Sequence, residues 1–297
     1  MSLIKKENVV SVEPVNNLKV NSMLKTRLLT SLILITIFLI ALFNLSPIQW
    51  AIFMLIIVVA SLWEWSSIAK FNKSFRYLYT VLTVLLCLTI VFCEKLNLSN
   101  LQNQAVFWAI LASVIFWILF APVWLFLRFP IKNPILLSFL GWLLIVPMWF
   151  AMMSLRQINP WFLLATMGTV WIADTTAYFV GKRYGKNKLA PSISPGKTWE
   201  GVVGALIAVS CYGGFLCYFL RLNIFIILGL WLVTILSIMG DLIESLIKRQ
   251  AEIKDSGNLL PGHGGMLDRI DGLTSTLPVV TFFVYFPVYY MNWFNVV

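Results

Sequence analysis

The chain has 297 residues, of which 60% are hydrophobic and only 11% are charged, and its mean hydropathy is +0.88. Soluble domains are about 45–50% apolar with about 25% charged residues, so this composition excludes an ordinary soluble protein. A net charge of +10 would also suit a nucleic-acid binder. The basic residues lie at the ends of apolar runs, however, which is typical of contact with anionic lipid headgroups, so we expect no nucleic-acid partner.

The first 25 residues are polar and contain no apolar core of the kind found in a signal peptide. We therefore predict a disordered cytoplasmic tail over residues 1–25. Residues 26–297 leave no room for a separate soluble domain and are predicted to form a single transmembrane domain.

Nine apolar runs approach the roughly 20 residues that a bilayer span needs. They cover residues 28–45, 48–63, 77–93, 105–127, 135–153, 161–180, 201–220, 224–247 and 273–293. A turn at Asn44–Pro47 separates the first two runs, and Pro134 and Pro160 precede later ones. Backbone polar groups in a bilayer must be satisfied internally, and the pattern does not suggest a barrel. We predict an all-α polytopic membrane protein with about nine transmembrane helices.

The basic residues are distributed unevenly between the two ends of these predicted spans. With a cytoplasmic N-terminus, nineteen of the 22 Lys and Arg residues lie on the cytoplasmic side, and only Lys95, Arg156 and Arg221 lie opposite. This asymmetry predicts that the N-terminus is inside.

The acidic residues cluster in the C-terminal part of the chain. Eight of the twelve lie between positions 174 and 271, all at cytoplasmic span ends or in the loops 181–200 and 248–272. They are Asp174, Glu200, Asp241, Glu244, Glu252, Asp255, Asp268 and Asp271. We therefore expect one membrane face to carry the chemistry, and we interpret the first 160 residues as scaffold.

One helix face near the end of the eighth predicted span carries several polar groups. Asp241, Glu244, Ser245 and Lys248 stand at positions i, i+3, i+4 and i+7 and share that face. Because ionisable side chains at membrane depth are costly, this face must look into the bundle or a wet cavity. A purely structural pairing of Glu244 with Lys248 is the alternative.

The following segment, residues 254–271, is the most polar and glycine-rich stretch of the chain. Its glycines and Pro261 preclude a regular helix, and bare backbone N–H groups can bind a phosphate. Acids interleaved with Lys, Arg and Gly suggest a divalent cation that bridges carboxylate and phosphate, and hard oxygen ligands suit Mg²⁺. His263 is the only histidine, and either a structural or a phosphate-binding role is open to it.

A third polar element precedes these two. Asp174 lies at a span end, and the basic loop after it contains Gly196-Lys197-Thr198, which invites a P-loop interpretation. That interpretation fails, because Pro191 occupies the position of the first required glycine and the sequence indicates no strand before it. A basic loop beside acids suits a triphosphate, whereas an ordinary cytoplasmic basic loop is the alternative.

These three elements together resemble a known family. Ser245-x-x-Lys248-Arg249, Lys254-Asp255-x-Gly257 and Leu260-Pro261-x-His263-Gly264-Gly265-Met266-x-Asp268-Arg269-Ile270-Asp271 are similar to the signature of the phosphatidate cytidylyltransferases, also called CDP-diacylglycerol synthases. Asp174-x-x-Ala177-Tyr178 and Ser194-Pro195-x-Lys197-Thr198-Trp199-Glu200-Gly201 also resemble that family. The motifs cover about residues 165–275.

The resemblance implies a reaction of CTP with phosphatidate to give CDP-diacylglycerol and pyrophosphate. It implies Mg²⁺ as cofactor, a homodimer in the inner membrane, and an active site that faces the cytoplasm. Asp241 and Asp268 are then the expected metal ligands. The expected catalytic residues are Lys248, Arg249, Lys254, Asp255, His263, Arg269 and Asp271, and the expected substrate-binding residues are Asp174, Lys197, Thr198, Ser245, Gly264 and Gly265.

Two other classes of protein remain as alternatives. An ion-coupled transporter with a site at Asp174, Asp241 and Glu244 would use buried acids, but these gather at one face rather than at the midplane. A structural membrane subunit would leave the acidic cluster unexplained.

Overall fold

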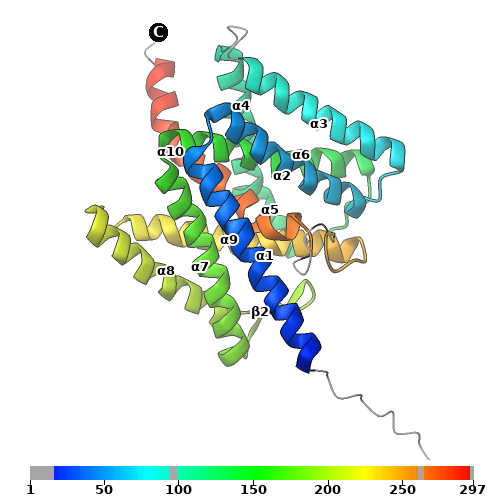
Figure 1. Cartoon of the computed structure of the whole chain (residues 1–297), viewed down its shortest axis with the longest axis vertical. Helices are drawn as coiled ribbons and strands as arrows, with labels where there is room; N and C mark the ends of the chain where they lie inside the picture. The colour runs from blue at the N-terminus through cyan, green and yellow to red at the C-terminus, as the bar shows by residue number, and fades with distance from the viewer. Residues whose placement is uncertain (1–16, 94–98, 258, 260–263, 295–297) are drawn as a thin grey trace, which may run out of the picture.

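The computed structural model describes residues 17–93, 99–257, 259 and 264–294, and most of these residues are helical (Figure 1). The elements in chain order are α1 (Asn17–Asn44), α2 (Pro47–Ile68), α3 (Lys73–Cys93), α4 (Ser99–Ile115), the π-helical turn η2 (Phe116–Phe120), α5 (Ala121–Leu127), α6 (Pro134–Ile158), α7 (Pro160–Tyr184), β1 (Lys188–Ala190), β2 (Ser194–Thr198), α8 (Trp199–Leu220), α9 (Ile226–Gln250) and α10 (Leu267–Phe294).

The helix starts follow directly from the sequence. Asn133 and Asn159 cap α6 and α7 with their side-chain oxygens, and a proline stands at the first helical position of each. These are favourable residues for the two positions, since an N-cap oxygen satisfies free N–H groups and proline has no N–H to lose. The expected helix starts at Pro134 and Pro160, and the turn before Pro47, are confirmed.

Seven helices of the described residues are long and apolar enough to cross a membrane, so the all-α polytopic class is confirmed. The predicted spans 28–45 and 273–293 also fall on helices, α1 and α10, but do not belong to these seven. Helix α1 begins at Asn17, within the segment 1–25 predicted as a tail, and the tail itself stays a prediction. Residues 1–16 lie outside the described part of the chain.

The core joins α2 to α6 through tryptophans that are almost fully buried. The indole N–H of Trp50 donates to the Met152 carbonyl at 3.3 Å, and that of Trp149 donates to the Ala51 carbonyl at 3.1 Å. Trp65 donates to Leu137 O at 2.8 Å. These bonds satisfy polar atoms away from water while the rings fill the core, so α2 is held firmly against α6.

The loop after α7 contains a short antiparallel hairpin, which the sequence did not predict. Lys188 pairs with Thr198 and Ala190 with Ser194, with an irregular register between them. Gly196-Lys197-Thr198 therefore lies inside strand β2 and not in a turn between a strand and a helix. The P-loop interpretation remains excluded, although our expectation that no strand precedes this motif was wrong.

We predict that Gly141→Ala will lower the thermal unfolding midpoint of the protein in detergent. A Cβ at Gly141 would lie 2.5 Å from Trp65 Nε1 and 2.6 Å from the Tyr79 hydroxyl, so the buried rings must move. Such overpacking costs about 1–3 kcal/mol. Gly214→Ala, on α8, is the control, because among the described residues nothing outside the local helix backbone lies within 4 Å of its added Cβ. An unchanged midpoint in Gly141→Ala would show that α2 and α6 pack less tightly than described.

Candidate functional site

The site forms where α9 and α10 cross at a very short distance. A Cβ at Gly240 would lie 2.6 Å from the Asp271 carbonyl, and one at Gly272 would lie 2.5 Å from Ser237 Oγ. Glycine at both positions permits this backbone approach. Since Asp241 follows the first glycine and Asp271 precedes the second, the crossing brings two acids together.

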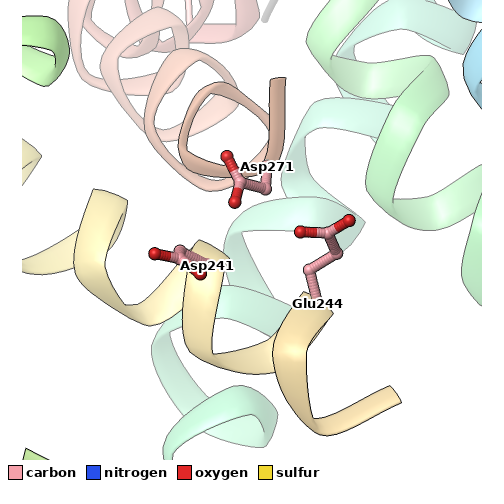
Figure 2. A group of neighbouring side chains, drawn as sticks. All are labelled: Asp241, Glu244 and Asp271. Carbon is pink, nitrogen blue, oxygen red and sulfur yellow. The ribbon is translucent and has the colours of Figure 1, made fainter. Parts of the chain in front are cut away.

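Three carboxylates meet at this crossing. Asp241 and Glu244 come from α9 and Asp271 from α10, and one oxygen of each lies within 4.8 Å of the others (Figure 2). Glu244 is buried, with 6% of its surface exposed, and the other two are half-buried. Like charges this close repel one another strongly unless a cation or protons compensate them.

The donor set fits a hard cation such as Mg²⁺ or another divalent ion. All three side chains offer carboxylate oxygens, which such ions prefer. Glu244 Oε1 is buried and accepts no hydrogen bond from the residues that the structure describes. A buried oxygen without a donor is costly, and a bound cation would satisfy it. These three acids are the candidate metal group.

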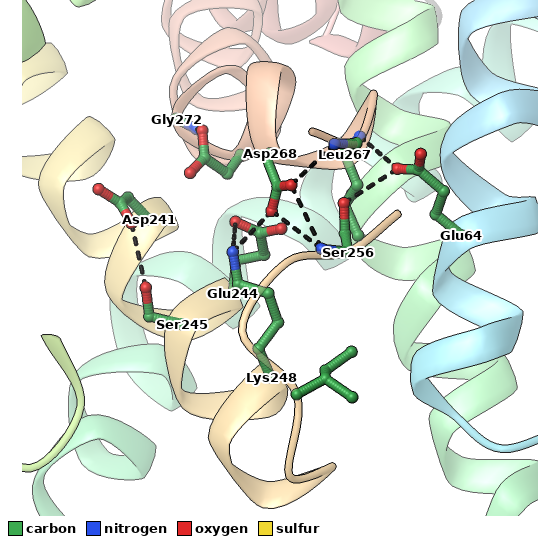
Figure 3. A network of polar contacts seen from close by, with 12 residues as sticks. Glu64, Asp241, Glu244, Ser245, Lys248, Ser256, Leu267, Asp268 and Gly272 are labelled. Atoms are coloured by element: carbon green, nitrogen blue, oxygen red, sulfur yellow. Dashed lines mark hydrogen bonds and ion pairs between the residues drawn. The ribbon is translucent and has the colours of Figure 1, made fainter. Parts of the chain in front are cut away.

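Two lysines flank the carboxylates. Lys197, from β2, lies with its Nζ 2.7 Å from Asp241 Oδ2 and donates to the Ile238 carbonyl at 3.1 Å. Lys248 lies between two acids, with its Nζ 3.1 Å from Glu244 Oε2 and 2.7 Å from Asp268 Oδ1 (Figure 3). The structural pairing of Glu244 with Lys248, left open above, is therefore present.

Asp268 occupies a different position from the one we expected. It lies outside the candidate metal group, and its oxygens accept from Lys248 and from the backbone N–H groups of Ser256 and Gly265. Its carboxylate thus ties the two ends of the glycine-rich segment to the end of α9. The predicted metal ligand Asp241 lies within the group, whereas Glu244 belongs to it without having been predicted as a ligand.

Gly264 and Gly265 shape the turn in front of α10. Gly264 has φ +80°, a conformation that side chains rarely adopt, and a Cβ there would approach Asp268 Oδ2 to 3.2 Å. Gly265 donates its N–H to the same oxygen at 3.0 Å. Both glycines therefore serve to bring backbone N–H groups onto a carboxylate, and their predicted contact with substrate stays a prediction.

The remaining predicted substrate-binding residues lie on helices and strands around the carboxylates. Asp174, on α7, accepts from Ser237 Oγ at 3.2 Å and interacts electrostatically with Asp241. Ser245 donates to Asp241 Oδ1 at 3.2 Å. Thr198 is buried and caps α8, since its Oγ1 accepts from the Gly201 N–H. The structure therefore gives Thr198 a structural contact, and any contact with CTP stays a prediction.

The other predicted catalytic residues lie at the outer rim. Arg249, Lys254, Asp255 and Arg269 are exposed, and Arg249 Nε donates to the Ile193 carbonyl of the hairpin turn at 3.3 Å. His263 lies outside the described residues. Arg249, Lys254 and Arg269 thus place positive charge on the exposed side of the site.

Glu64 is the residue that sequence reasoning missed. It lies on α2, in the part of the chain that we interpreted as scaffold, and it accepts hydrogen bonds from Ser256, Met266 and Leu267 of the glycine-rich segment (Figure 3). One signal was available: Glu64 is a single acid between Trp63 and Trp65, at a span end predicted on the same face as the other acids.

Known proteins resemble this chain over most of its length. A phosphatidate cytidylyltransferase of Haemophilus influenzae is 33% identical over 294 residues, which cover 89% of this chain and 99% of the relative. Its counterpart in Pseudomonas aeruginosa is 38% identical over 285 residues, which cover 86% of this chain and 95% of the relative. A phosphatidate cytidylyltransferase of Staphylococcus aureus strain COL is 43% identical over 122 residues, which cover 40% of this chain and 47% of the relative.

These relatives do not support the transporter alternative. The profile of the cytidylyltransferase family itself matches residues 25–287, which include every described element of the site. The chain therefore belongs to the cytidylyltransferase family.

Proposed function

We propose that this protein transfers CMP from CTP to phosphatidate and releases CDP-diacylglycerol and pyrophosphate. The observation that carries this proposal is the meeting of Asp241, Glu244 and Asp271 beside Lys197 and Lys248, at one end of an apolar bundle. Family membership, and relatives named for this activity over most of the chain, support the same reaction.

The chemistry requires charge compensation more than a covalent protein intermediate. An oxygen of the lipid phosphate forms a bond to the α-phosphorus of CTP, while the bond from that phosphorus to the bridging oxygen breaks and pyrophosphate leaves. Both reactants are anions, so their approach is unfavourable unless cations offset the repulsion. Positioning and electrostatic stabilisation dominate such phosphoryl-transfer reactions.

The protein supplies cations of its own for this purpose. Lys197 and Lys248 stand beside the carboxylates, and Arg249, Lys254 and Arg269 are exposed at the rim. We assign the two lysines to the phosphates nearest the reacting centre and the rim residues to the outer phosphates.

A divalent cation, Mg²⁺ in this proposal, would be held by Asp241, Glu244 and Asp271. When bound, it would offset part of the negative charge of the three acids and of the triphosphate, and the lysines beside the acids would offset more. Asp268, which we expected as a ligand from the resemblance, stays a prediction in that role, because its oxygens contact Lys248 and two backbone N–H groups.

The location and assembly of the protein are part of the same proposal. We place it in the inner membrane with its N-terminus and carboxylate site on the cytoplasmic side, where CTP is available, because the basic residues are concentrated at that end. A homodimer is inferred from the resemblance, and light scattering of the detergent-solubilised protein measures its mass directly.

The reaction itself gives the first prediction. Purified protein with CTP, phosphatidate and Mg²⁺ should release pyrophosphate and form a CDP-lipid, and release should stop when phosphatidate is omitted. Without the lipid there is no acceptor oxygen, and the chain contains no P-loop for hydrolysis. Equal rates of pyrophosphate release with and without phosphatidate would contradict the proposal.

Substitutions of the acids separate metal ligands from their neighbours. Asp241→Asn and Asp271→Asn should each lower activity by about 10²-fold or more and raise the Mg²⁺ concentration at half-maximal activity, since an amide binds hard cations poorly. Glu252→Gln is the control, because Glu252 is exposed and outside the group.

Asp268→Asn distinguishes the two roles open to that residue. A raised Mg²⁺ midpoint with an unchanged rate of trypsin cleavage after the exposed Lys254 makes Asp268 a ligand. A lower rate at an unchanged midpoint, or a raised midpoint with faster cleavage, makes it a structural contact of Lys248 and the glycine-rich segment. If Asp241→Asn and Asp271→Asn both retain the wild-type rate at low Mg²⁺, the metal group is wrongly assigned.

Orientation is tested with single cysteines in a variant from which Cys87, Cys93, Cys211 and Cys217 have been removed. Leu259→Cys, at a half-exposed side chain in the glycine-rich segment, should react in intact cells only with a membrane-permeant reagent. Gln157→Cys, exposed at the far end of α6, should react with an impermeant one. The reverse pattern would invert the proposed topology.

A further inference from the structure

Glu64 is a buried acid for which the proposed reaction has no use. Only 3% of the surface of this residue is exposed, and the other residues of its helix carry no charge. A carboxylate in such surroundings is unfavourable unless hydrogen bonds or a cation compensate it. Among the described residues, the ion pairs do not include Glu64, so its stabilisation must come from hydrogen bonds.

Those hydrogen bonds all come from the glycine-rich segment. Glu64 Oε2 accepts from Ser256 Oγ at 3.0 Å and from the Leu267 N–H at 2.9 Å, and Oε1 accepts from the Met266 N–H at 3.0 Å (Figure 3). Ser256 precedes the glycines, whereas Met266 and Leu267 follow them. One carboxylate therefore holds both ends of the segment together.

The glycines fit closely around this carboxylate. A Cβ at Gly257 would lie 2.5 Å from Glu64 Oε1, and a Cβ at Gly265 would lie 2.5 Å from Oε2. Any other residue at either position would push the acid away. The backbone at Gly257 and Gly265 therefore fits closely around the Glu64 carboxylate.

Asp268 extends the same contact toward the site. Its oxygens accept from the backbone N–H groups of Ser256 and Gly265 and from Lys248, which also contacts Glu244. Glu64 thus fixes the two ends of the segment, and the second of these ends leads directly into α10, whose first turn contains Asp268. Asp271 follows three residues later in the same helix.

We propose that Glu64 is a positioning residue: it fixes the base of the glycine-rich segment and the start of α10, so that Asp271 meets Asp241 and Glu244, and Asp268 meets Lys248. Its effect on catalysis rests on the function proposed above. Its effect on the glycine-rich segment does not depend on that function and can be measured without any substrate.

The test compares Glu64→Gln, Glu64→Ala and Ser256→Ala with Ser61→Ala. Ser61 is a suitable control because it is also buried on α2, and its hydroxyl donates only within the helix, to the Ile57 carbonyl at 2.8 Å. In Glu64→Gln, an amide N–H₂ replaces one oxygen and faces a donor, so at least one of the three bonds is lost. Ser256→Ala removes one donor and leaves Glu64 intact.

Three quantities are measured on the folded, detergent-solubilised protein: kcat, the Mg²⁺ midpoint, and the rate of trypsin cleavage after Lys254, which is exposed within the segment. A misplacement of about 1 Å can reduce a rate by about 10²-fold, so we expect kcat to fall by about 10- to 100-fold in the Glu64 variants. The Mg²⁺ midpoint should rise, and cleavage should accelerate several-fold because the segment opens more often. Ser256→Ala should change all three in the same direction but less, and Ser61→Ala should resemble the wild type.

A merely structural role gives a different result. If the Glu64 variants yield less folded protein, but the folded fraction keeps the wild-type Mg²⁺ midpoint and cleavage rate, the proposal is wrong. If cleavage accelerates in the Glu64 variants while wild-type protein does not convert CTP and phosphatidate, the role in positioning the segment stands and the proposed reaction fails. If the wild type is active and the Glu64 variants behave like Ser61→Ala, the reaction stands and the positioning role fails.

Discussion

The site depends on one close crossing of two helices. Because Gly240 and Gly272 remove side chains where α9 meets α10, Asp241 and Asp271 approach each other and Glu244 to within 4.8 Å. In an apolar bundle, such a group of acids is unfavourable without positive charge. The neighbouring features follow from that requirement: lysines on two sides, exposed basic residues at the rim, and a set of oxygens suited to a divalent ion.

The two lysines reach the acids from different elements. Lys197 reaches Asp241 from the hairpin between α7 and α8, and Lys248 reaches Glu244 and Asp268 from the last turns of α9. Each lysine contacts an acid that also faces the crossing. An arriving triphosphate would therefore compete with the carboxylates for the same ammonium groups. On binding, each lysine would exchange a carboxylate for a phosphate.

Local patterns allowed much of this arrangement to be predicted from the sequence. Apolar runs, prolines and capping residues located α6 and α7, and the i, i+3, i+4 and i+7 spacing placed Asp241, Glu244, Ser245 and Lys248 on one face. Three features could not be predicted. The strands of the hairpin have only three and five residues. Asp268 contacts Lys248, twenty residues earlier in the chain, and Glu64 makes contacts that link opposite halves of the chain. All three depend on tertiary packing, which a single sequence does not encode locally.

The separation of Glu64 from its partners has a consequence for how the protein is made. Ser256 and Leu267 lie 192 and 203 residues after Glu64, so their contacts are among the most distant in the chain. Membrane proteins are synthesised from the N-terminus, and early segments are inserted before late ones exist. During most of synthesis, therefore, α2 carries an acid whose hydrogen-bond donors have not yet emerged from the ribosome. The carboxylate site can therefore form only in the closing stage of biogenesis, after the C-terminal helices have joined the part of the chain already embedded in the bilayer.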